Sequence, residues 1–457
     1  MIIKILRPRL DGKLLAAAGH EEASSEDYHD TTFAVSDLLH ENSQKRHALA
    51  SFSISHRAFM RASVEQNYSI AGVHKLSVST ALKRMISLLR LVEINDTVRS
   101  SIRHLYVHTG SSGDVTDLDD AAVATLKYSI APMGFTLPYL DSNDEGRLRS
   151  YLGYCVGLIL IRLPKLQEVT LRVSHSTLQA MTQILSIAQT HQSSSSTTPL
   201  LVPTLQALSI SDVWWEYDGE VDTYLLTKPG SERCFHSSVL GKQLNISTIA
   251  SLVLDDVQME VPLLARTVRS CEALRKLVCV RFAALMMSSS DLDALMNAIQ
   301  YRCKTLATLC LDLKTWHYVQ DQRVYDRIAT LGELPNLEQL WITVCSFAGH
   351  SEEDNIDSSE SQSHNSNESD TDDSSRAEYE VFETFLPSLP ESLKRLHLAG
   401  EVTRPSLLSM AQRIKMGGLR NLREIGLSRG QWDDELEGAF AEYVPSRTRV
   451  DPRPALW

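Results

Sequence analysis

The chain has 457 residues, of which 43% are hydrophobic and 22% are charged, an ordinary globular composition that permits a sizeable core. The formal net charge is −12, but residues 351–380 alone hold eleven acidic residues against one base, so the rest of the chain is nearly neutral. This balance excludes the basic footprint of a protein that binds nucleic acid.

The spacing of the cysteines and the length of the apolar runs indicate the cellular compartment of the protein. The seven cysteines form no CxxC pair, which indicates buried thiols in a reducing compartment rather than a disulfide framework. The longest apolar run, residues 152–161, is about half of what a membrane-spanning helix needs. The start of the chain lacks the long apolar run of a secretory signal peptide. We therefore expect an intracellular protein, cytoplasmic or nuclear, that does not bind membranes.

Residues 1–98 are predicted to form a small helical N-terminal region. Residues 20–36 within it are polar and acidic, and they are expected to be poorly ordered. From Leu38 the chain becomes helical in character, and residues 47–62 combine apolar residues with a Ser-His-Arg run and an aromatic residue.

One short pattern recurs over residues 99–349 and again over residues 379–457. It consists of an apolar residue, two variable residues, an apolar residue, one variable residue and an apolar residue. The nine copies begin at Ile102, Leu166, Leu205, Ile249, Leu274, Leu306, Leu337, Leu393 and Leu422. The last two apolar positions are two residues apart, so each copy predicts a short strand that buries one face and offers the other to solvent or to a partner.

Segments with helical periodicity lie between the copies. Four of them are predicted around residues 178–188, 261–271, 292–303 and 407–414. The last is preceded by Pro405 and followed by Gly417-Gly418, which are start and stop signals in the right order. Strands that alternate with helices in this way predict an α/β fold, an irregular solenoid with parallel strands inside and helices outside.

Residues 350–378 contain nine serines and almost no apolar side chains. Such a segment cannot bury enough surface to offset its ordering entropy, so it predicts an acidic disordered loop between two repeats. Ser351, Ser369 and Ser375 each have an acidic residue three positions later, which makes them candidate phosphorylation sites. The alternative is an inert loop.

The nine copies, several of them introduced by a Leu-Pro pair, resemble the leucine-rich-repeat family, and specifically the irregular repeats of F-box proteins. The similarity covers residues 100–445, although the asparagine that usually follows the strand is missing from nearly every copy. In the N-terminal region, Leu49, Ile54, Arg57 and Phe59 resemble the second half of an F-box, whose opening is absent.

The resemblance implies a horseshoe whose repeats hold a protein substrate. It also implies that the N-terminal helices bind a Skp-type adaptor and, through it, a cullin-type ubiquitin ligase. The alternative for these helices is a cap over the exposed end of the repeats, which any solenoid requires.

If the strands line a concave face, the variable positions of the copies point into it. These candidate partner-binding residues are Glu168, Thr170, Arg172, Ser209, Asp255, Lys276, Asp312, Trp341, Arg395, His397 and Glu424. Their charges alternate in sign, which favours a protein partner over a nucleic acid. Trp341 is a candidate for an exposed aromatic anchor of the kind found at interface hot spots, and the alternative is that neighbouring loops cover it.

The chain lacks the common catalytic motifs. It has no GxSxG elbow, no phosphate-binding loop, no HExxH and no paired CxxC, and its histidines are scattered. We therefore predict a non-catalytic protein-interaction module with no cofactor and no metal, most specifically a substrate-recruiting ligase adaptor. The alternatives are a repeat scaffold without a ligase link and an unrecognised α/β enzyme.

Overall fold

The structure is a computed structural model. It describes residues 68–110, 120–137, 145–192, 204–212, 246–255, 257, 261–280, 289–312, 329–343, 389–399, 402, 404–428 and 432–450. The F-box-like residues between 49 and 59, the segment 20–36 and the acidic segment 350–378 with its candidate phosphorylation sites lie outside the described residues.

The chain divides into two compact units, which are described separately. The first comprises Met1–Gln258, Ser270–Ala273 and Ala455–Trp457, and the second comprises Met259–Arg269 and Leu274–Pro454.

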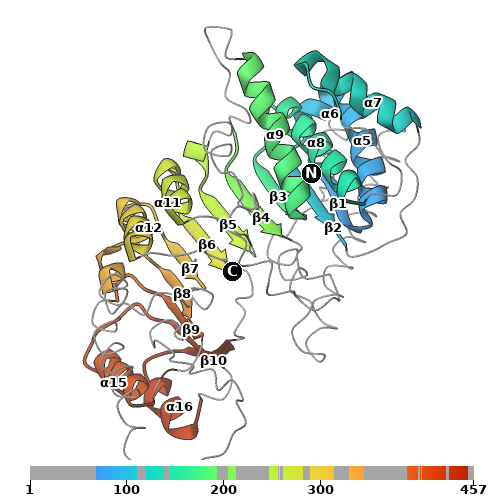
Figure 1. The fold of residues 1–457 in the computed structure, drawn as a ribbon. Helices are drawn as coiled ribbons and strands as arrows, with labels where there is room; N and C mark the ends of the chain where they lie inside the picture. The colour runs from blue at the N-terminus through green and yellow to red at the C-terminus, as the bar shows by residue number, and fades with distance from the viewer. Residues whose placement is uncertain are drawn as a thin grey trace, which may run out of the picture. The chain divides into compact units, whose positions relative to one another are not determined.

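The first unit contains five parallel strands that pair in chain order, with helices between them (Figure 1). Its elements are β1 (Ile70–Leu76), α5 (Val78–Ile94), α6 (Asp96–Ser101), β2 (His104–Thr109), α7 (Asp120–Ile130), η2 (Ala131–Met133), α8 (Glu145–Arg162), β3 (Glu168–Val173), α9 (His175–Gln192), β4 (Ala207–Asp212), η4 (Ile246–Thr248) and β5 (Ser251–Asp255).

The second unit repeats the same arrangement with six parallel strands in chain order. Its elements are α11 (Val261–Ser270), β6 (Lys276–Val280), α12 (Ser289–Tyr301), β7 (Thr308–Leu311), η5 (Ala329–Glu333), β8 (Gln339–Thr343), β9 (Arg395–Ala399), α15 (Arg404–Lys415), β10 (Glu424–Ser428), α16 (Asp434–Ala441) and β11 (Ser446–Val450).

The sequence repeats coincide with the strands. The nine copies of the pattern form β2 to β10, and the four predicted helices are α9, α11, α12 and α15. The leading apolar residue of every copy is buried. The prediction of an α/β fold with parallel strands is therefore confirmed.

The helical region predicted for residues 1–98 also contains a strand, β1. This strand pairs in parallel with β2, in a register that puts the half-buried Tyr68 at the position of the leading apolar residue. It contains Gly72, whose φ of 152° is unfavourable for other residues. A Cβ at this position would lie 1.7 Å from the carbonyl oxygen of Tyr106. Because no side chain fits there, β1 has a glycine at a position where eight of the nine copies have a residue with a side chain.

Helix α8 is the most buried helix of the first unit. Its residues Tyr151 to Leu160 are buried, and they include nearly all of the apolar run noted in the sequence. Two glycines on its face let α9 approach closely, since a Cβ on Gly153 would lie 2.1 Å from the Thr177 carbonyl oxygen and a Cβ on Gly157 3.1 Å from that of Met181. The long interval between β2 and β3 thus contains this core helix and, in addition, α7.

Backbone hydrogen bonds join the start of each strand to the next. In the first unit the Arg103 carbonyl accepts the N–H groups of Gln167 and Glu168, at 2.7 and 3.0 Å. The Gln167 carbonyl accepts those of Gln206 and Ala207 in the same way, at 2.7 and 3.1 Å. Each carbonyl with two donors holds consecutive repeats in register before the sheet ladder begins.

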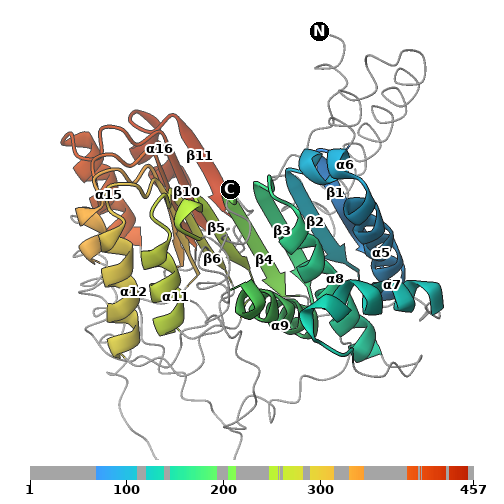
Figure 2. The same cartoon turned by 90° about the horizontal axis from the view of Figure 1, so that it is seen from above.

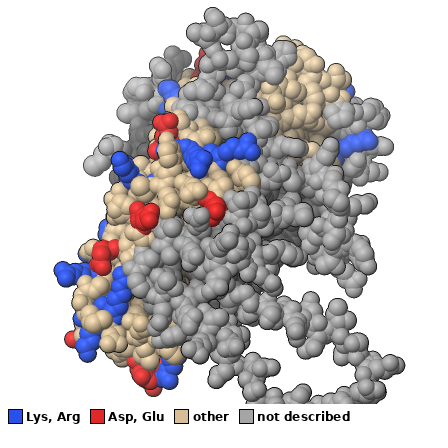
Figure 3. Space-filling model, turned by 60° about the vertical axis from the view of Figure 1, so that its left-hand side comes forward, with Lys and Arg blue, Asp and Glu red and all other residues tan. Residues whose placement is uncertain are grey.

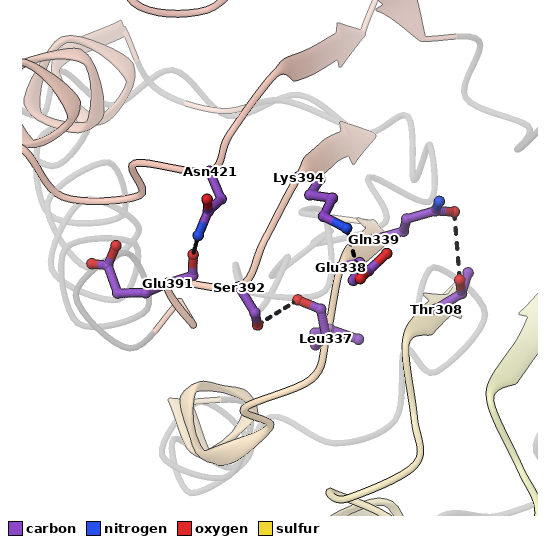
Figure 4. Close-up of polar contacts among 8 residues, drawn as sticks. All are labelled: Thr308, Leu337, Glu338, Gln339, Glu391, Ser392, Lys394 and Asn421. Atoms are coloured by element: carbon purple, nitrogen blue, oxygen red, sulfur yellow. Dashed lines mark hydrogen bonds and ion pairs between the residues drawn. The ribbon is translucent and has the colours of Figure 1, made fainter.

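Polar side chains reinforce these junctions. In five copies the residue directly before the leading apolar residue donates to a backbone carbonyl of the preceding repeat. The bonds run from Thr204 to Leu166 (2.7 Å), Thr248 to Leu205 (2.6 Å), Asn336 to Lys304 (2.8 Å), Ser392 to Leu337 (2.8 Å) and Asn421 to Glu391 (2.8 Å). Figure 4 shows the last two. These bonds satisfy backbone carbonyls between consecutive repeats, and they lie just before each strand. The asparagine that most copies lack would follow the strand instead.

Within each unit the helices cover one face of the strands (Figures 1 and 2). We call the other side the helix-free face. The prediction that this face is open to solvent holds for β3 and β4, where buried and half-buried residues alternate, and in part for β9. It is wrong for β2 and β5 to β8, where both faces are buried beyond the first residue.

Candidate functional site

All eleven candidate residues of the predicted concave face lie on the helix-free faces. In the first unit Glu168 pairs in register with His104, and Arg172 lies between His108 on β2 and Ser211 on β4. Ser211 in turn pairs with Asp255. Strand alternation therefore places these side chains in parallel rows, with neighbouring strands ~4.8 Å apart.

In the second unit two rows contain the remaining candidates. The row at the strand starts includes Lys276, Arg395 and Glu424. The next row includes Trp341 and His397, which pair in register. Asp312 follows directly after β7 and continues the same alternation.

Arg395, His397 and Glu424 form one cluster of charged and polar side chains. His397 Nε2 lies 3.0 Å from Glu424 Oε1, and Arg395 Nε lies 3.9 Å from Glu424 Oε2. Burial lowers the pKa of His397, and the neighbouring Glu424 carboxylate opposes that shift. The Arg395 side chain is 38% exposed, so it is accessible at the start of its strand.

Of the two alternatives for Trp341, an exposed anchor or a covered side chain, the structure shows the covered one. The residue is on the helix-free face but only 1% exposed. Its row neighbour Cys310 is buried as well, and its indole Nε1 has no hydrogen-bond partner among the described residues. Asp255 and Asp312 are also buried, at 4% and 7% exposure. The face therefore has an apolar, covered middle and an accessible start, because Val278, Cys310 and Trp341 occupy the variable middle positions.

Polar and charged side chains at the strand starts contact carboxylates of the neighbouring strand. His104 Nδ1 lies 2.9 Å from Glu168 Oε2, and this contact lowers the pKa of the Glu168 carboxyl, while burial opposes the shift. Lys394 Nζ lies 2.7 Å from Glu338 Oε1 at the edge of β8 and β9 (Figure 4). Figure 3 shows acidic and basic side chains interspersed on the face that it draws, without a single large field of one sign.

A polar cluster in the first unit was not predicted. The Tyr106 hydroxyl lies 3.0 Å from His74 Nδ1 and 3.2 Å from His108 Nδ1, and the two histidine nitrogens are 3.3 Å apart. The alternation of polar residues in His104-Leu-Tyr-Val-His108 was the signal in the sequence. His74 had no such signal, because the alternate positions before it in β1 are Ile70 and Gly72 and not polar residues.

Arg172 is the cationic neighbour of this cluster. Burial, and then the charge of Arg172 followed by His74 and Lys75, lower the pKa of His108 to about 2. The Arg172 guanidinium is half-buried, and its Nε is fully buried with no hydrogen-bond partner among the described residues. The same part of the structure places no acidic side chain in an ion pair with it.

The neutral state of His108 predicts sensitivity to acid. The unfolded chain binds a proton at His108 near pH 6.5 and the folded chain only near pH 2, so this residue favours unfolding as the pH falls below 6.5. Between pH 7 and pH 5 we expect it to remove about 2 kcal/mol of stability. The measurement is urea denaturation of the wild type and of His108→Asn at both pH values. The variant should lose less stability on acidification, and equal losses would contradict the expectation.

Among the described residues, no group of three or more His, Cys, Asp or Glu side chains is placed to hold a metal ion. In the same part of the chain, none of the helices combines the length and the apolar character that a membrane span requires. No protein-family model and no curated protein sequence matches the chain.

Proposed function

We propose that this protein is a non-catalytic binding module of the irregular leucine-rich-repeat type, whose helix-free faces bind another protein. The supporting observation is that nine copies of one sequence pattern form successive parallel strands with their variable positions in register. Such an arrangement presents a two-dimensional array of side chains that can differ from strand to strand while the scaffold stays constant.

The chemistry of the array favours a protein partner. Both signs of charge are present at the accessible strand starts, with Glu168 exposed, and Lys276, Arg395 and Glu424 half-buried. Alternating charges select a partner of complementary pattern, whereas a nucleic acid requires a basic surface. Repeat proteins bind through extended faces of this kind rather than through a closed pocket.

The more specific proposal is that the module recruits substrates to a cullin-type ubiquitin ligase. It depends on the similarity of Leu49, Ile54, Arg57 and Phe59 to part of an F-box. In this proposal the N-terminal region binds a Skp-type adaptor, and the repeats hold the substrate in the cytoplasm or nucleus.

One affinity-purification experiment with mass spectrometry tests both the protein-binding proposal and the ubiquitin-ligase proposal. The full chain is compared with Arg395→Gln, which changes the helix-free face, and with Lys415→Gln, which makes the same charge change on exposed α15. We expect a set of partners that the wild type and the Lys415 variant retain and that the Arg395 variant loses at least tenfold. Identical partner sets for all three proteins would contradict the role of this face.

The adaptor is read out in the same experiment with the double variant Leu49→Ala, Phe59→Ala. We expect a Skp-type adaptor and a cullin with the wild type and with Arg395→Gln, and neither of them with the double variant. If purified adaptor fails to bind the full chain, the ligase proposal fails and the scaffold without a ligase link remains.

A further inference from the structure

The Arg172 side chain has an unusual environment for a cation. Its Nε is buried without a hydrogen-bond partner, and no described side chain forms an ion pair with it. A guanidinium has five N–H donors, and to take it partly out of water without an anion is unfavourable. Because buried polar groups are nearly always satisfied, such a group points to a missing partner.

The groups around Arg172 are neutral or positively charged. His108 lies beside it on β2, in contact with Tyr106 and His74, and Ser211 lies beside it on β4. The positions two residues earlier on β3 and β4 carry the hydroxyl groups of Thr170 and Ser209, which pair in register. The donors on this part of the helix-free face thus lie beside the positive charge of Arg172, and Lys75 is a second cation whose charge acts on His108.

The acidic residue in the same row does not neutralise that charge. Asp255 is two strands away from Arg172, which corresponds to ~10 Å of sheet. Its Oδ2 accepts a hydrogen bond from the Ser211 hydroxyl at 3.5 Å. Glu168 is on the same strand as Arg172 but at the start of that strand, where its carboxylate contacts His104.

We propose that Arg172, with the imidazole and hydroxyl groups beside it, is a binding site for a carboxylate that an acidic side chain of the partner protein supplies. The forked guanidinium matches the two oxygens of one carboxylate, and the neutral donors add hydrogen bonds without adding charge. This proposal rests on the proposed protein-binding function, since it names the chemistry of the partner at that face.

Purified full-length protein tests the site without any partner. Its melting temperature is measured in sodium acetate and in sodium phosphate, with sodium chloride added to keep the ionic strength constant. For the wild type we expect a saturable rise of about 2–4 °C at an acetate concentration ten times the dissociation constant. Arg172→Gln should show no rise and Arg172→Lys a smaller one, because lysine keeps the charge but not the fork.

Arg84→Gln is the matched control. Arg84 is an exposed arginine on α5, on the helix-covered side of the same unit, so this variant should respond to acetate as the wild type does. Without acetate, Arg172→Gln should melt at the same temperature as the wild type or higher, because it removes a desolvated charge that lacks a partner. If Arg172 instead stabilised the fold, Arg172→Gln would melt at a lower temperature than the wild type.

Three outcomes would overturn the proposal. These are no saturable response to acetate in the wild type, an equal response in Arg172→Gln, and a phosphate response that is larger than the acetate response and depends on Arg172.

The partners captured by the wild type should also bind Arg172→Gln at least tenfold more weakly. If acetate binds at Arg172 while no partner is captured, the carboxylate site stands and the protein-binding function fails. If partners are captured but acetate does not bind, the protein-binding function stands and the carboxylate site fails.

Discussion

Replacement of Trp341 by alanine is expected to lower the free energy of unfolding by about 3–5 kcal/mol. Trp341 is one of the largest fully buried side chains in the described part of the chain, at 1% exposure in the middle of β8. Its loss would leave a cavity between Cys310 on β7 and His397 on β9. The measurement is chemical denaturation followed by circular dichroism.

Trp341→Phe is the matched control for this prediction. It keeps an aromatic ring in the site and removes only the indole N–H, which has no hydrogen-bond partner among the described residues. We expect it to cost much less than the alanine variant. An alanine variant as stable as the wild type would show that the side chain is exposed in solution. Loss of a partner from Trp341→Ala is therefore no measure of a binding hot spot unless stability is measured as well.

Replacement of Gly153 by alanine is expected to destabilise the first unit by about 2–3 kcal/mol, because the added methyl group overpacks the α8–α9 contact. The new Cβ would lie 2.1 Å from the Thr177 carbonyl oxygen and 2.8 Å from the Ala180 Cβ. The nearest obstacle is backbone, which cannot rotate away as a side chain can, so the two helices must separate. Denaturant titration of the full chain gives the change in stability.

Gly438→Ala is the corresponding control in α16. A Cβ at this position meets nothing within 4 Å, and the residue is exposed within a helix. We expect this variant to be stabilised by about 0.5–1 kcal/mol through the lower entropy of its unfolded chain. If both variants lost similar stability, the close approach of α8 and α9 would not be the cause.

Sequence periodicity was sufficient where at least one face of an element packs through regularly spaced apolar residues. Strands β2 to β10 and helices α9, α11, α12 and α15 were predictable for this reason, since apolar residues recur at spacings that identify the element. Helix α8 was not predicted, because a helix buried on all sides shows no periodicity, and its glycines reflect a neighbour that is distant in sequence. Strand β1 was missed because it has a tyrosine, Tyr68, at its leading position and Gly72 at its middle variable position.

The candidate site was predictable in its positions but not in its environment. Strand alternation put all eleven candidate residues on the helix-free faces. The polar residue before each repeat, as at Thr248, Ser392 or Asn421, was visible in the sequence, but its role required the carbonyl of the preceding repeat. The sequence left open whether Trp341 is exposed or covered, because a one-dimensional pattern does not include what covers a strand.

The sequence by itself determined the parallel α/β repeat, since the alternation of buried and variable positions is a local property of each strand. Only the tertiary structure decided which variable positions are buried and which side chains meet. His74, Tyr106 and His108 come from two strands, and the unpaired charge of Arg172 depends on which residues flank it across the sheet. The reason is physical: burial and electrostatics depend on distances between residues that are far apart in the chain, and the repeat pattern does not contain those distances.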